Sequence, residues 1–411
     1  MAGKCVWILN HYAITPDMAG ITRHFDLGKE LIKRGYEVVI FASGFDHVSK
    51  KFIKVGPRER FRVEELEGLR FVWLNTLPYY DNNWRRVANM VSYGLRILGS
   101  TTRSVKNPDV IIGSSMHPFA ALAGWWLAKR YKARFIFEVR DLWPQTAIDM
   151  GAMKSTGLSA RLLYAWEKLM YLQAEKVIVL MPGARQYYTS RGVDPGKICW
   201  IPNGVDVERF RDTTSLDPST EAAQALERHQ DKFKVIYAGA HGQANGLEVA
   251  IEAAALISKR EAAVHFIFIG DGPEKQALRE KAEQLGCANV TFCDPVPKAG
   301  VPAVLKQADL LMQCIRPVDV LKYGGSPNKV NDYLASGRPV VMAAAVANDP
   351  VAEAQAGLTV LPGDAEALAE GILQLFKMRP EERERLGANG RAYVEKYYDT
   401  KRLGETLAQI L

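Results

Sequence analysis

Short apolar runs alternate with helix-length amphipathic segments from one end of this 411-residue chain to the other. This alternation is typical of parallel β-sheets whose strands are joined by crossover helices. The strands predicted for the first half are Val6–Asn10, Glu37–Ala42, Phe71–Asn75, Val110–Gly113, Phe135–Val139 and Val177–Leu180. Those predicted for the second half are Lys234–Ala238, His265–Ile269, Val290–Phe292, Leu310–Cys314, Val340–Ala343 and Leu358–Val360.

The chain is longer than a single hydrophobic core usually supports, and its length predicts two domains. The strand and helix pattern restarts after the polar stretch Asp212–Gln230. We therefore expect two doubly wound, Rossmann-like α/β domains, at residues 1–203 and 204–390. The last segment, residues 391–411, carries a helical pattern and no strand signal.

Composition and cysteine usage favour a globular protein of a reducing compartment. Hydrophobic residues make up 48% of the chain and charged residues 24%, and the five cysteines form no Cys-x-x-Cys pair. The first apolar run, Cys5–Leu9, is too short for a signal peptide, and the long apolar stretch Ile111–Ala128 is interrupted by polar residues and Pro118. We expect a cytoplasmic location and no transmembrane segment.

Positive charge is concentrated in one part of the first domain. Between Asn82 and Phe137 the only acidic residue is Asp109, and the segment Trp84–Leu98 interleaves basic and apolar residues at helical spacing. Such a helix could lie on an anionic membrane surface, or it could be a core helix with a solvated basic face. Nucleic acid is not an expected partner, because the rest of the chain is nearly charge-balanced and carries no binding motif.

The segment Gly325–Val341 predicts a helix whose first turns carry charged side chains suited to ligand binding. Ser326 suits the N-cap, Pro327 the first helical position, and Gly337 the position just past the end. A helix N-terminus with Lys329 in its first turn is suited to phosphate, and Asp332, three residues further on, could hold a ribose diol. The alternative is that Lys329 and Asp332 form only a solvated pair.

The run Ser326–Lys329, followed by Asp332–Val341, resembles the donor-site signature of group 1 (family 4) retaining glycosyltransferases. It is most similar to a bacterial surface-polysaccharide branch, that of N-acetylfucosamine and hexosamine transferases. The resemblance implies the GT-B architecture of two facing Rossmann-like domains with a cleft between them, and a C-terminal helix, 391–411, that packs back on the first domain.

The resemblance also suggests which residues bind the donor. It matches a glycine of the first loop, a glycine-rich phosphate loop, a loop that reads the base, and the helix start. A histidine of the phosphate loop, His241, and a lysine before the helix, Lys322, are added to these. The candidate donor-binding residues are Gly20, Gly239, His241, Gly242, Pro295, Val296, Lys322, Ser326, Pro327, Asn328, Lys329 and Asp332.

Three positions depart from the family pattern. Ala240 stands where the phosphate loop usually has an arginine, Asn245 where it has a lysine, and Gly324 where a sugar-binding glutamate is usual. An unpaired diphosphate would be strongly disfavoured, so another cation should compensate. Lys322, Lys329 and Arg316 are the candidates.

Candidates for the chemistry lie at strand ends. The segment Phe137–Pro144 resembles a family segment at the cleft, with Arg140 in place of a histidine, and Arg140 and Asp141 could orient sugar hydroxyls or simply pin the loop to each other. His11, His117 and His241 each follow a predicted strand, and His117 is favoured as a group acting on the acceptor. The predicted catalytic residues are Arg140, Asp141, His117 and Lys329.

The expected activity is transfer of a hexose or N-acetylhexosamine from a UDP-sugar to a polyprenyl-diphosphate-linked or other membrane glycan, at the inner face of the cell membrane. No Asp-x-Asp ends a strand, so we expect neither a metal nor another cofactor. The alternatives are a UDP-sugar 2-epimerase or phosphorylase of the same architecture, and a catalytically silent sugar-nucleotide-binding subunit. The sequence does not indicate an oligomeric state.

Overall fold

The computed structural model describes residues 3–18, 20–47, 49–56, 58–81, 83–211 and 216–411, and it divides into two compact units. Unit 1 is formed by Met1–Thr15, Ile21–Pro202 and Thr400–Leu411, and unit 2 by Pro16–Gly20 and Asn203–Asp399. The domain boundaries predicted from the sequence are 203 and 390. In the structure residues 391–399 belong to unit 2, and so does the short segment 16–20 from the loop after the first strand.

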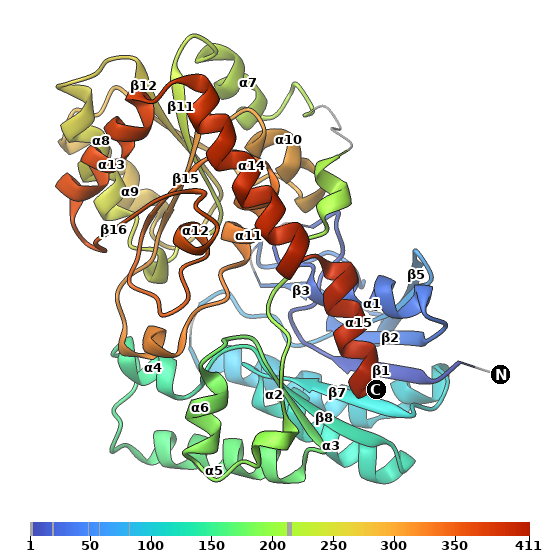
Figure 1. Cartoon of the computed structure of the whole chain (residues 1–411). Helices are drawn as coiled ribbons and strands as arrows, with labels where there is room; N and C mark the ends of the chain where they lie inside the picture. Colours follow the sequence, from blue (N-terminus) through green and yellow to red (C-terminus); the bar gives the residue numbers. More distant parts are fainter. Residues whose placement is uncertain (1–2, 19, 48, 57, 82, 212–215) are drawn as a thin grey trace. The chain divides into compact units, whose positions relative to one another are not determined.

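Unit 1 is built on an eight-stranded sheet with the order β10-β9-β8-β7-β1-β2-β6-β5 (Figure 1). Every neighbouring pair is parallel except β5 and β6. The strands are β1 (Cys5–Leu9), β2 (Glu37–Ser43), β5 (Phe61–Leu66), β6 (Leu69–Leu74), β7 (Val110–Ser114), β8 (Arg134–Val139), β9 (Lys176–Val179) and β10 (Ile198–Trp200). A separate antiparallel pair consists of β3 (Phe45–Asp46) and β4 (Lys51–Phe52).

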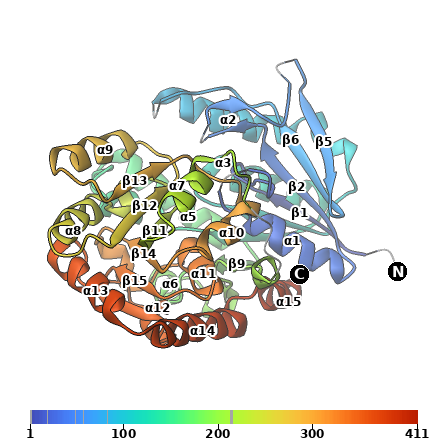
Figure 2. The same ribbon diagram turned by 90° about the horizontal axis from the view of Figure 1, so that it is seen from above.

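The six strands predicted for the first half are all present, but β3, β4, β5 and β10 were not predicted. β5 pairs antiparallel with β6 at the edge of the sheet, and Figure 2 shows the two strands side by side. Its sequence mixes charged and apolar residues, since an edge strand with a solvated face need not be a continuous apolar run. β10 has only three residues and gives no periodic signal.

The principal helices of unit 1 are α1 (Arg23–Lys33), α2 (Trp84–Leu98), α3 (Pro118–Tyr131), α4 (Gln145–Asp149), α5 (Leu158–Gln173), α6 (Ala184–Thr189) and α15 (Thr400–Ile410). α3 packs against both α2 and α5, so these three helices form one row. Of the helices in the described part of the chain, none combines the length and the hydropathy that crossing a bilayer requires.

The C-terminal helix α15 packs on α1. A Cβ on Gly404 would lie 2.4 Å from Cβ of Glu30, so the glycine permits the close approach of the two helices. Arg34 of the C-cap position of α1 pairs with Glu405 at 2.9 Å. The predicted start of this returning segment is residue 391, but α14 (Pro380–Tyr397) belongs to unit 2, and the return to unit 1 begins at Thr400.

Unit 2 contains a fully parallel six-stranded sheet with the order β13-β12-β11-β14-β15-β16. Its strands are β11 (Phe233–Ala238), β12 (Val264–Ile269), β13 (Val290–Cys293), β14 (Leu310–Cys314), β15 (Val340–Ala343) and β16 (Gly357–Val360). Each was predicted to within a residue or two from its apolar run. A strand buried on both faces is apolar throughout, which is the strongest strand signal a sequence carries.

Helices cover the unit 2 sheet in two groups, each with its own apolar core. One core involves α8 (Glu248–Ser258), α9 (Lys275–Gln284) and α13 (Ala365–Lys377). The other involves α7 (Glu221–Arg228), α10 (Val301–Leu305), α11 (Asn328–Ala335), α12 (Pro350–Glu353) and α14. α7, capped by Thr220, lies in the polar stretch Asp212–Gln230, for which no helix was predicted; residues 212–215 of that stretch lie outside the described residues.

Candidate functional site

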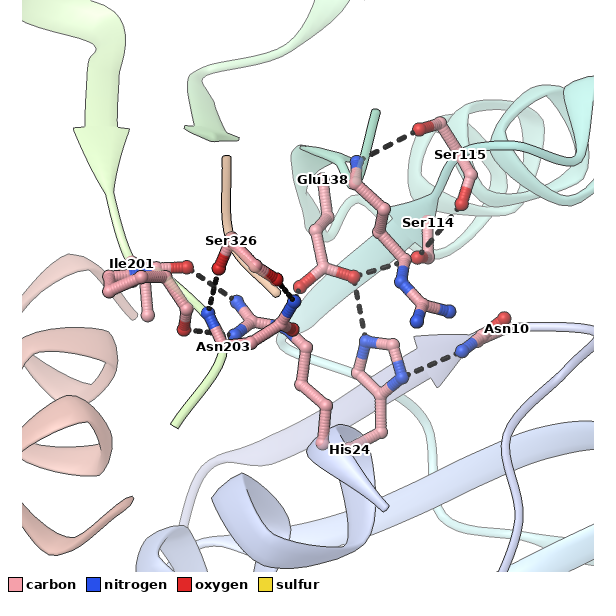
Figure 3. A network of polar contacts seen from close by, with 11 residues as sticks. Asn10, His24, Ser114, Ser115, Glu138, Ile201, Asn203 and Ser326 are labelled. Carbon is pink, nitrogen blue, oxygen red and sulfur yellow. Dashed lines mark hydrogen bonds and ion pairs between the residues drawn. The ribbon is translucent and has the colours of Figure 1, made fainter. Parts of the chain in front are cut away.

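The predicted helix at Ser326–Ser336 is α11, but its start differs in detail from the prediction. Ser326 is not the N-cap: its hydroxyl accepts the backbone N–H of Asn203 at 2.9 Å, and its carbonyl accepts the Asn203 side-chain amide at 2.8 Å (Figure 3). Pro327 takes the cap position, and Asn328 begins the helix. In the described chain no side chain caps this end, so the first backbone N–H groups of α11 are left for another acceptor. Gly337 follows the helix with φ +74°, as predicted.

Lys329 extends from the first turn of α11 to the glycine-rich loop after β11. Its ammonium donates to Oδ1 of Asn245 at 2.7 Å. A Cβ on Gly239 would lie 2.2 Å from Cε of Lys329, so the lysine occupies the space that the glycine leaves. Burial lowers the pKa of Lys329 to about 8. The lysine therefore holds its proton at neutral pH but is poorly solvated, and a phosphate would relieve that cost.

The loop itself is held at both ends. The Tyr333 hydroxyl of α11 accepts the backbone N–H of Ala238 at 2.9 Å and donates to the Ala238 carbonyl at 3.1 Å. Asn245, which stands where the family usually has a lysine, donates its amide to the Ala240 carbonyl at 2.9 Å. α11 and the loop after β11 therefore form one bonded unit, in which Lys329 supplies the cation.

The other two candidate cations differ from Lys329. Arg316 lies beside the loop but pairs with Glu248 at 2.6 Å, and both line a cavity of about 190 Å³ together with Gly246. Lys322 is exposed, with its ammonium 5.4 Å from the centre of the Tyr323 ring. Among these three candidate cations, Lys329 is the one whose ammonium donates a hydrogen bond to the glycine-rich loop in the described structure.

Asp332 is bonded to a lysine that the sequence analysis did not single out. Its carboxylate forms an ion pair with Lys298, so it does not pair with Lys329, and the alternative of a solvated Lys329–Asp332 pair is wrong. Lys298 begins the 3-10 turn that follows Pro295 and Val296, the predicted base-reading loop. Only the fold brings these two residues together, because they are 34 positions apart.

The segment from the loop after β1 that belongs to unit 2 contacts Lys298 as well. The Met18 carbonyl accepts the backbone N–H of Lys298 at 3.2 Å. Gly20, the predicted donor-loop glycine, has φ +140°, a conformation that favours glycine. The loop after β1, the base loop and Asp332 are therefore linked through Lys298 within unit 2.

His241 lies within the glycine-rich loop after β11 and is fully buried. Neither nitrogen of its ring has a hydrogen-bond partner among the described residues. Burial, and secondarily the nearby lysines, lower the pKa of His241 to about 4, so the ring is neutral at pH 7. It packs against Phe292 at 6.0 Å between ring centres, and Gly242 follows it. An unpaired buried imidazole is costly unless a ligand satisfies it, which supports the prediction that His241 contacts the donor.

Unit 1 contains a buried network centred on Glu138 of β8 (Figure 3). Its carboxylate accepts Nε of Arg23 at 2.9 Å, Nε2 of His24 at 2.7 Å and the Ser114 hydroxyl at 2.7 Å. Burial opposes the charge, but His24 and Arg23 hold the pKa of Glu138 well below its usual value. The second nitrogen of His24 bonds Asn10 at 2.8 Å, which ties in the end of β1.

Arg23 also holds the end of the unit 1 chain. Its guanidinium donates to the carbonyls of Ile201, at 2.8 Å, and Pro202, the last residue before the chain passes to unit 2 (Figure 3). Arg23, His24 and Glu138 were not singled out from the sequence, because Arg23 and His24 lie in one of the helix-length segments and Glu138 lies inside an apolar strand. The signal was present, since a glutamate within a buried strand almost always has a charged partner.

Arg140 and Asp141 follow β8, as predicted, but no ion pair between their side chains is found in the described residues. The backbone N–H of Arg140 donates to the Ser115 hydroxyl at 3.1 Å, and its Nε is buried without a hydrogen-bond partner. Burial raises the pKa of Asp141 to about 6, against the lowering effect of Arg140. The interpretation in which the two side chains merely pin each other is not supported, and both groups are left for other partners.

His117 is the N-cap of α3. Its Nδ1 accepts the backbone N–H of Ala120 at 3.0 Å, and its ring stacks on His11 at 4.7 Å between ring centres. Burial and then His11 hold the pKa of His117 well below the usual value, so the ring is neutral. With Nδ1 accepting, the proton lies on Nε2, which is buried and unpaired. His117 is thus equipped to donate a hydrogen bond, not to remove a proton as a base.

The predicted site residues fall into two groups. Arg140, Asp141 and His117 belong to unit 1, and all the predicted donor-binding residues, with Lys329, belong to unit 2. Among the residues that the structure describes, no three His, Cys, Asp or Glu side chains are grouped so as to hold a metal ion.

Comparison with known proteins finds family models on both halves of the chain. A model described as "Glycosyl transferase 4-like domain" matches residues 20–204, and one described as "Glycosyl transferases group 1" matches residues 232–378. The first covers most of unit 1, and the second the sheet and the donor-type loops of unit 2.

Individual relatives agree with these matches. The chain is 25% identical over 373 residues to WcaI of Escherichia coli (strain K12), a candidate colanic acid biosynthesis glycosyl transferase. The matched region covers 88% of this chain and 89% of WcaI. Among solved structures, a sucrose-phosphate synthase from Thermosynechococcus elongatus has a TM-score of 0.75 at 20% identity, covering 99% and 98% of the two chains. HepE from Anabaena, solved with UDP and glucose, has a TM-score of 0.69 at 15% identity and covers 99% of both chains.

Proposed function

Since this chain belongs to the group 1 family of glycosyltransferases, with the GT-B fold, we propose that it transfers a hexose or N-acetylhexosamine from a UDP-sugar with retention of anomeric configuration. The observation that carries the proposal is the contact between Lys329 and the glycine-rich loop, on the helix that also bears Asp332. It supplies a cation for a diphosphate and a carboxylate for a ribose. HepE, a structural neighbour, binds UDP and glucose, which supports the choice of nucleotide.

Each group has a role in this reaction. Lys329 and the uncapped N–H groups of α11 stabilise the departing diphosphate, where negative charge develops as the glycosidic bond breaks. Asp332 holds the ribose diol, with Lys298 fixing its orientation. The base lies along Pro295 and Val296. In unit 1, Arg140, Asp141 and the Nε2–H of His117 bind sugar or acceptor hydroxyls.

The acceptor we propose is a glycan carried on a polyprenyl diphosphate, used in building a bacterial surface polysaccharide. Support comes from WcaI, whose name places it in colanic acid biosynthesis. It also comes from α2, which presents Trp84, Arg85 and Leu95 to solvent. Arg86 of the same helix belongs to a different environment: burial opposes its charge, while Tyr12 and Tyr79 raise its pKa. An anionic membrane surface would therefore contact Arg85 and not Arg86.

Asp332→Ala should weaken UDP binding about ten- to a hundred-fold, because a hydrogen bond to a charged group contributes roughly 1.5–3 kcal/mol. Titration calorimetry with UDP measures the loss. Inorganic pyrophosphate, which has no ribose, serves as the control ligand and should bind wild type and variant alike. An unchanged UDP affinity would remove Asp332 from the donor site, and an equal loss for pyrophosphate would mean that the helix start had been disturbed.

Activity should persist in excess EDTA, because Lys329 and a helix N-terminus are proposed to neutralise the diphosphate without a divalent ion. The measurement is sugar transfer by the purified chain after dialysis against EDTA, with and without added Mg²⁺ or Mn²⁺. Loss of activity in EDTA and recovery with either ion would show that a metal carries the charge instead.

A further inference from the structure

The outer side of α5 carries a row of leucines that the rest of unit 1 does not cover. Leu158, Leu162, Leu169 and Leu172 are 72%, 61%, 36% and 53% exposed, and the exposed Ala165 lies between them. The steps of four and three residues place all five on one side of the helix. Single exposed leucines are ordinary, but a row along a whole helix marks a surface that contacts something.

The exposed charges within the segment that carries this row are of one sign. From Met150 to Gln173 the only acidic residue is Glu167, which is buried and accepts the Tyr188 hydroxyl at 2.9 Å. Lys154, Arg161 and Lys168 are exposed. The solvent-facing side of this segment is therefore apolar and basic.

The neighbouring helix α3 extends the same character. It packs against α5 and carries the exposed Trp126, beside Trp125. The Arg130 guanidinium lies 5.4 Å from the Trp126 ring centre, and the Lys129 ammonium lies 4.3 Å from that of Trp125. Tryptophan next to basic residues is the composition typical of protein surfaces at the lipid headgroup level.

We propose that the leucine row of α5 inserts into the headgroup and acyl boundary of an anionic bilayer, with Arg161 and Lys168 at the lipid phosphates. This proposal rests on the proposed function in one respect, that the acceptor is carried by a membrane. It assigns the insertion to α5, which the charge pattern of the sequence did not indicate.

A second copy of this chain is the competing occupant, because the leucine spacing would also suit a helix pair. A two-fold interface brings the same patch of both copies together, which would place Arg161 and Lys168 near their own counterparts with no exposed acid on α5 to balance them. An anionic lipid surface supplies the missing negative charge.

The test is co-flotation of the full chain with phosphatidylcholine vesicles, with and without phosphatidylglycerol. Wild type should bind the anionic vesicles, and less so at high salt. Leu162→Glu and Leu169→Glu should each lower the vesicle partition coefficient about tenfold or more, because each replaces an inserting apolar group by a charge of the lipid's own sign. Leu361→Glu, at a leucine of unit 2 that is 69% exposed, is the control and should bind as wild type does.

Circular dichroism and UDP titration check that the variants fold, and sedimentation measures the oligomeric state. Circular dichroism and UDP affinity should be unchanged in both α5 variants, since both positions face solvent. Vesicle binding by Leu162→Glu equal to wild type would overturn the proposal, and so would a wild-type dimer in sedimentation that this variant dissociates. A protein that binds UDP but no vesicle refutes this inference alone, whereas one that binds vesicles but no UDP refutes the proposed function.

Discussion

Replacing Lys329 by methionine should lower kcat for sugar transfer by about 10²–10³-fold, the effect typical of removing one group that stabilises charge in the transition state. Methionine keeps much of the side-chain length next to Gly239 but cannot neutralise a departing diphosphate or donate to Asn245. The measurement is initial-rate kinetics at saturating donor. Lys259→Met, at an exposed lysine of the same unit outside every predicted site segment, is the control and should lose little. Equal losses of activity in the two variants would rule out this role for Lys329.

The same lysine predicts how UDP binding depends on pH. In the free protein burial holds the pKa of Lys329 at about 8, so the ammonium form that binds a diphosphate is depleted above that pH. Apparent affinity scales with the binding-competent fraction, and it should fall about tenfold between pH 7 and pH 9. Uridine, which lacks phosphate, should show no such trend, and neither should UDP with the Lys329→Met variant. A UDP affinity that rises toward pH 9 would contradict the assignment.

Glu138→Ala should lower the stability of unit 1 by about 3–5 kcal/mol, the cost of leaving a buried charge without its partner. The change strands the guanidinium of Arg23 and removes the bonds to His24 and Ser114. It also loosens the hold of Arg23 on the Ile201 and Pro202 carbonyls. Urea denaturation, followed by a signal from unit 1 because two units need not unfold together, measures the free energy of unfolding.

Glu175→Ala provides the matched control, because Glu175 pairs with Arg134 in the same unit but at an exposed site. Exposed pairs contribute about 0–1 kcal/mol, so this variant should unfold near wild type. The pKa of Glu138 is depressed in the folded state, so its contribution is complete above the ordinary carboxyl value of 4.5 and is lost as pH falls through the folded pKa. The difference in the free energy of unfolding between wild type and Glu138→Ala should therefore become smaller only in acid. An equal loss of stability in Glu138→Ala and Glu175→Ala at pH 7 would contradict the role given to Glu138.

Local signals account for what the sequence predicted well. The strands of the unit 2 sheet are apolar runs with at most one polar residue each, and α11 is bounded by Pro327 and Gly337, so both could be located without knowing the fold. Lys329 and Asp332 could be singled out because they lie within one turn of each other. The cap at Ser326 was wrong because its hydroxyl bonds Asn203, a partner 123 positions away.

The features that sequence reasoning missed depend on distant partners or on weak periodicity. Lys298 reaches Asp332 across 34 positions, and Arg23 reaches Glu138 across 115. No spacing rule predicts such pairs. α7 was hidden in a polar stretch because a short helix with one small apolar face resembles a linker. The leucine row of α5 has the period of a core helix, and only the structure reveals that its leucines face outward.

The proposed reaction moves a sugar from a UDP-sugar to a lipid-linked glycan with retention of anomeric configuration. Incubating the purified chain with radiolabelled UDP-hexoses and UDP-N-acetylhexosamines, with and without a polyprenyl-diphosphate glycan, tests it most directly. Label should appear in the lipid fraction only when the acceptor is present, with the anomeric configuration of the donor preserved in the product. Conversion of the UDP-sugar to an epimer without acceptor, or an inverted linkage, would contradict it.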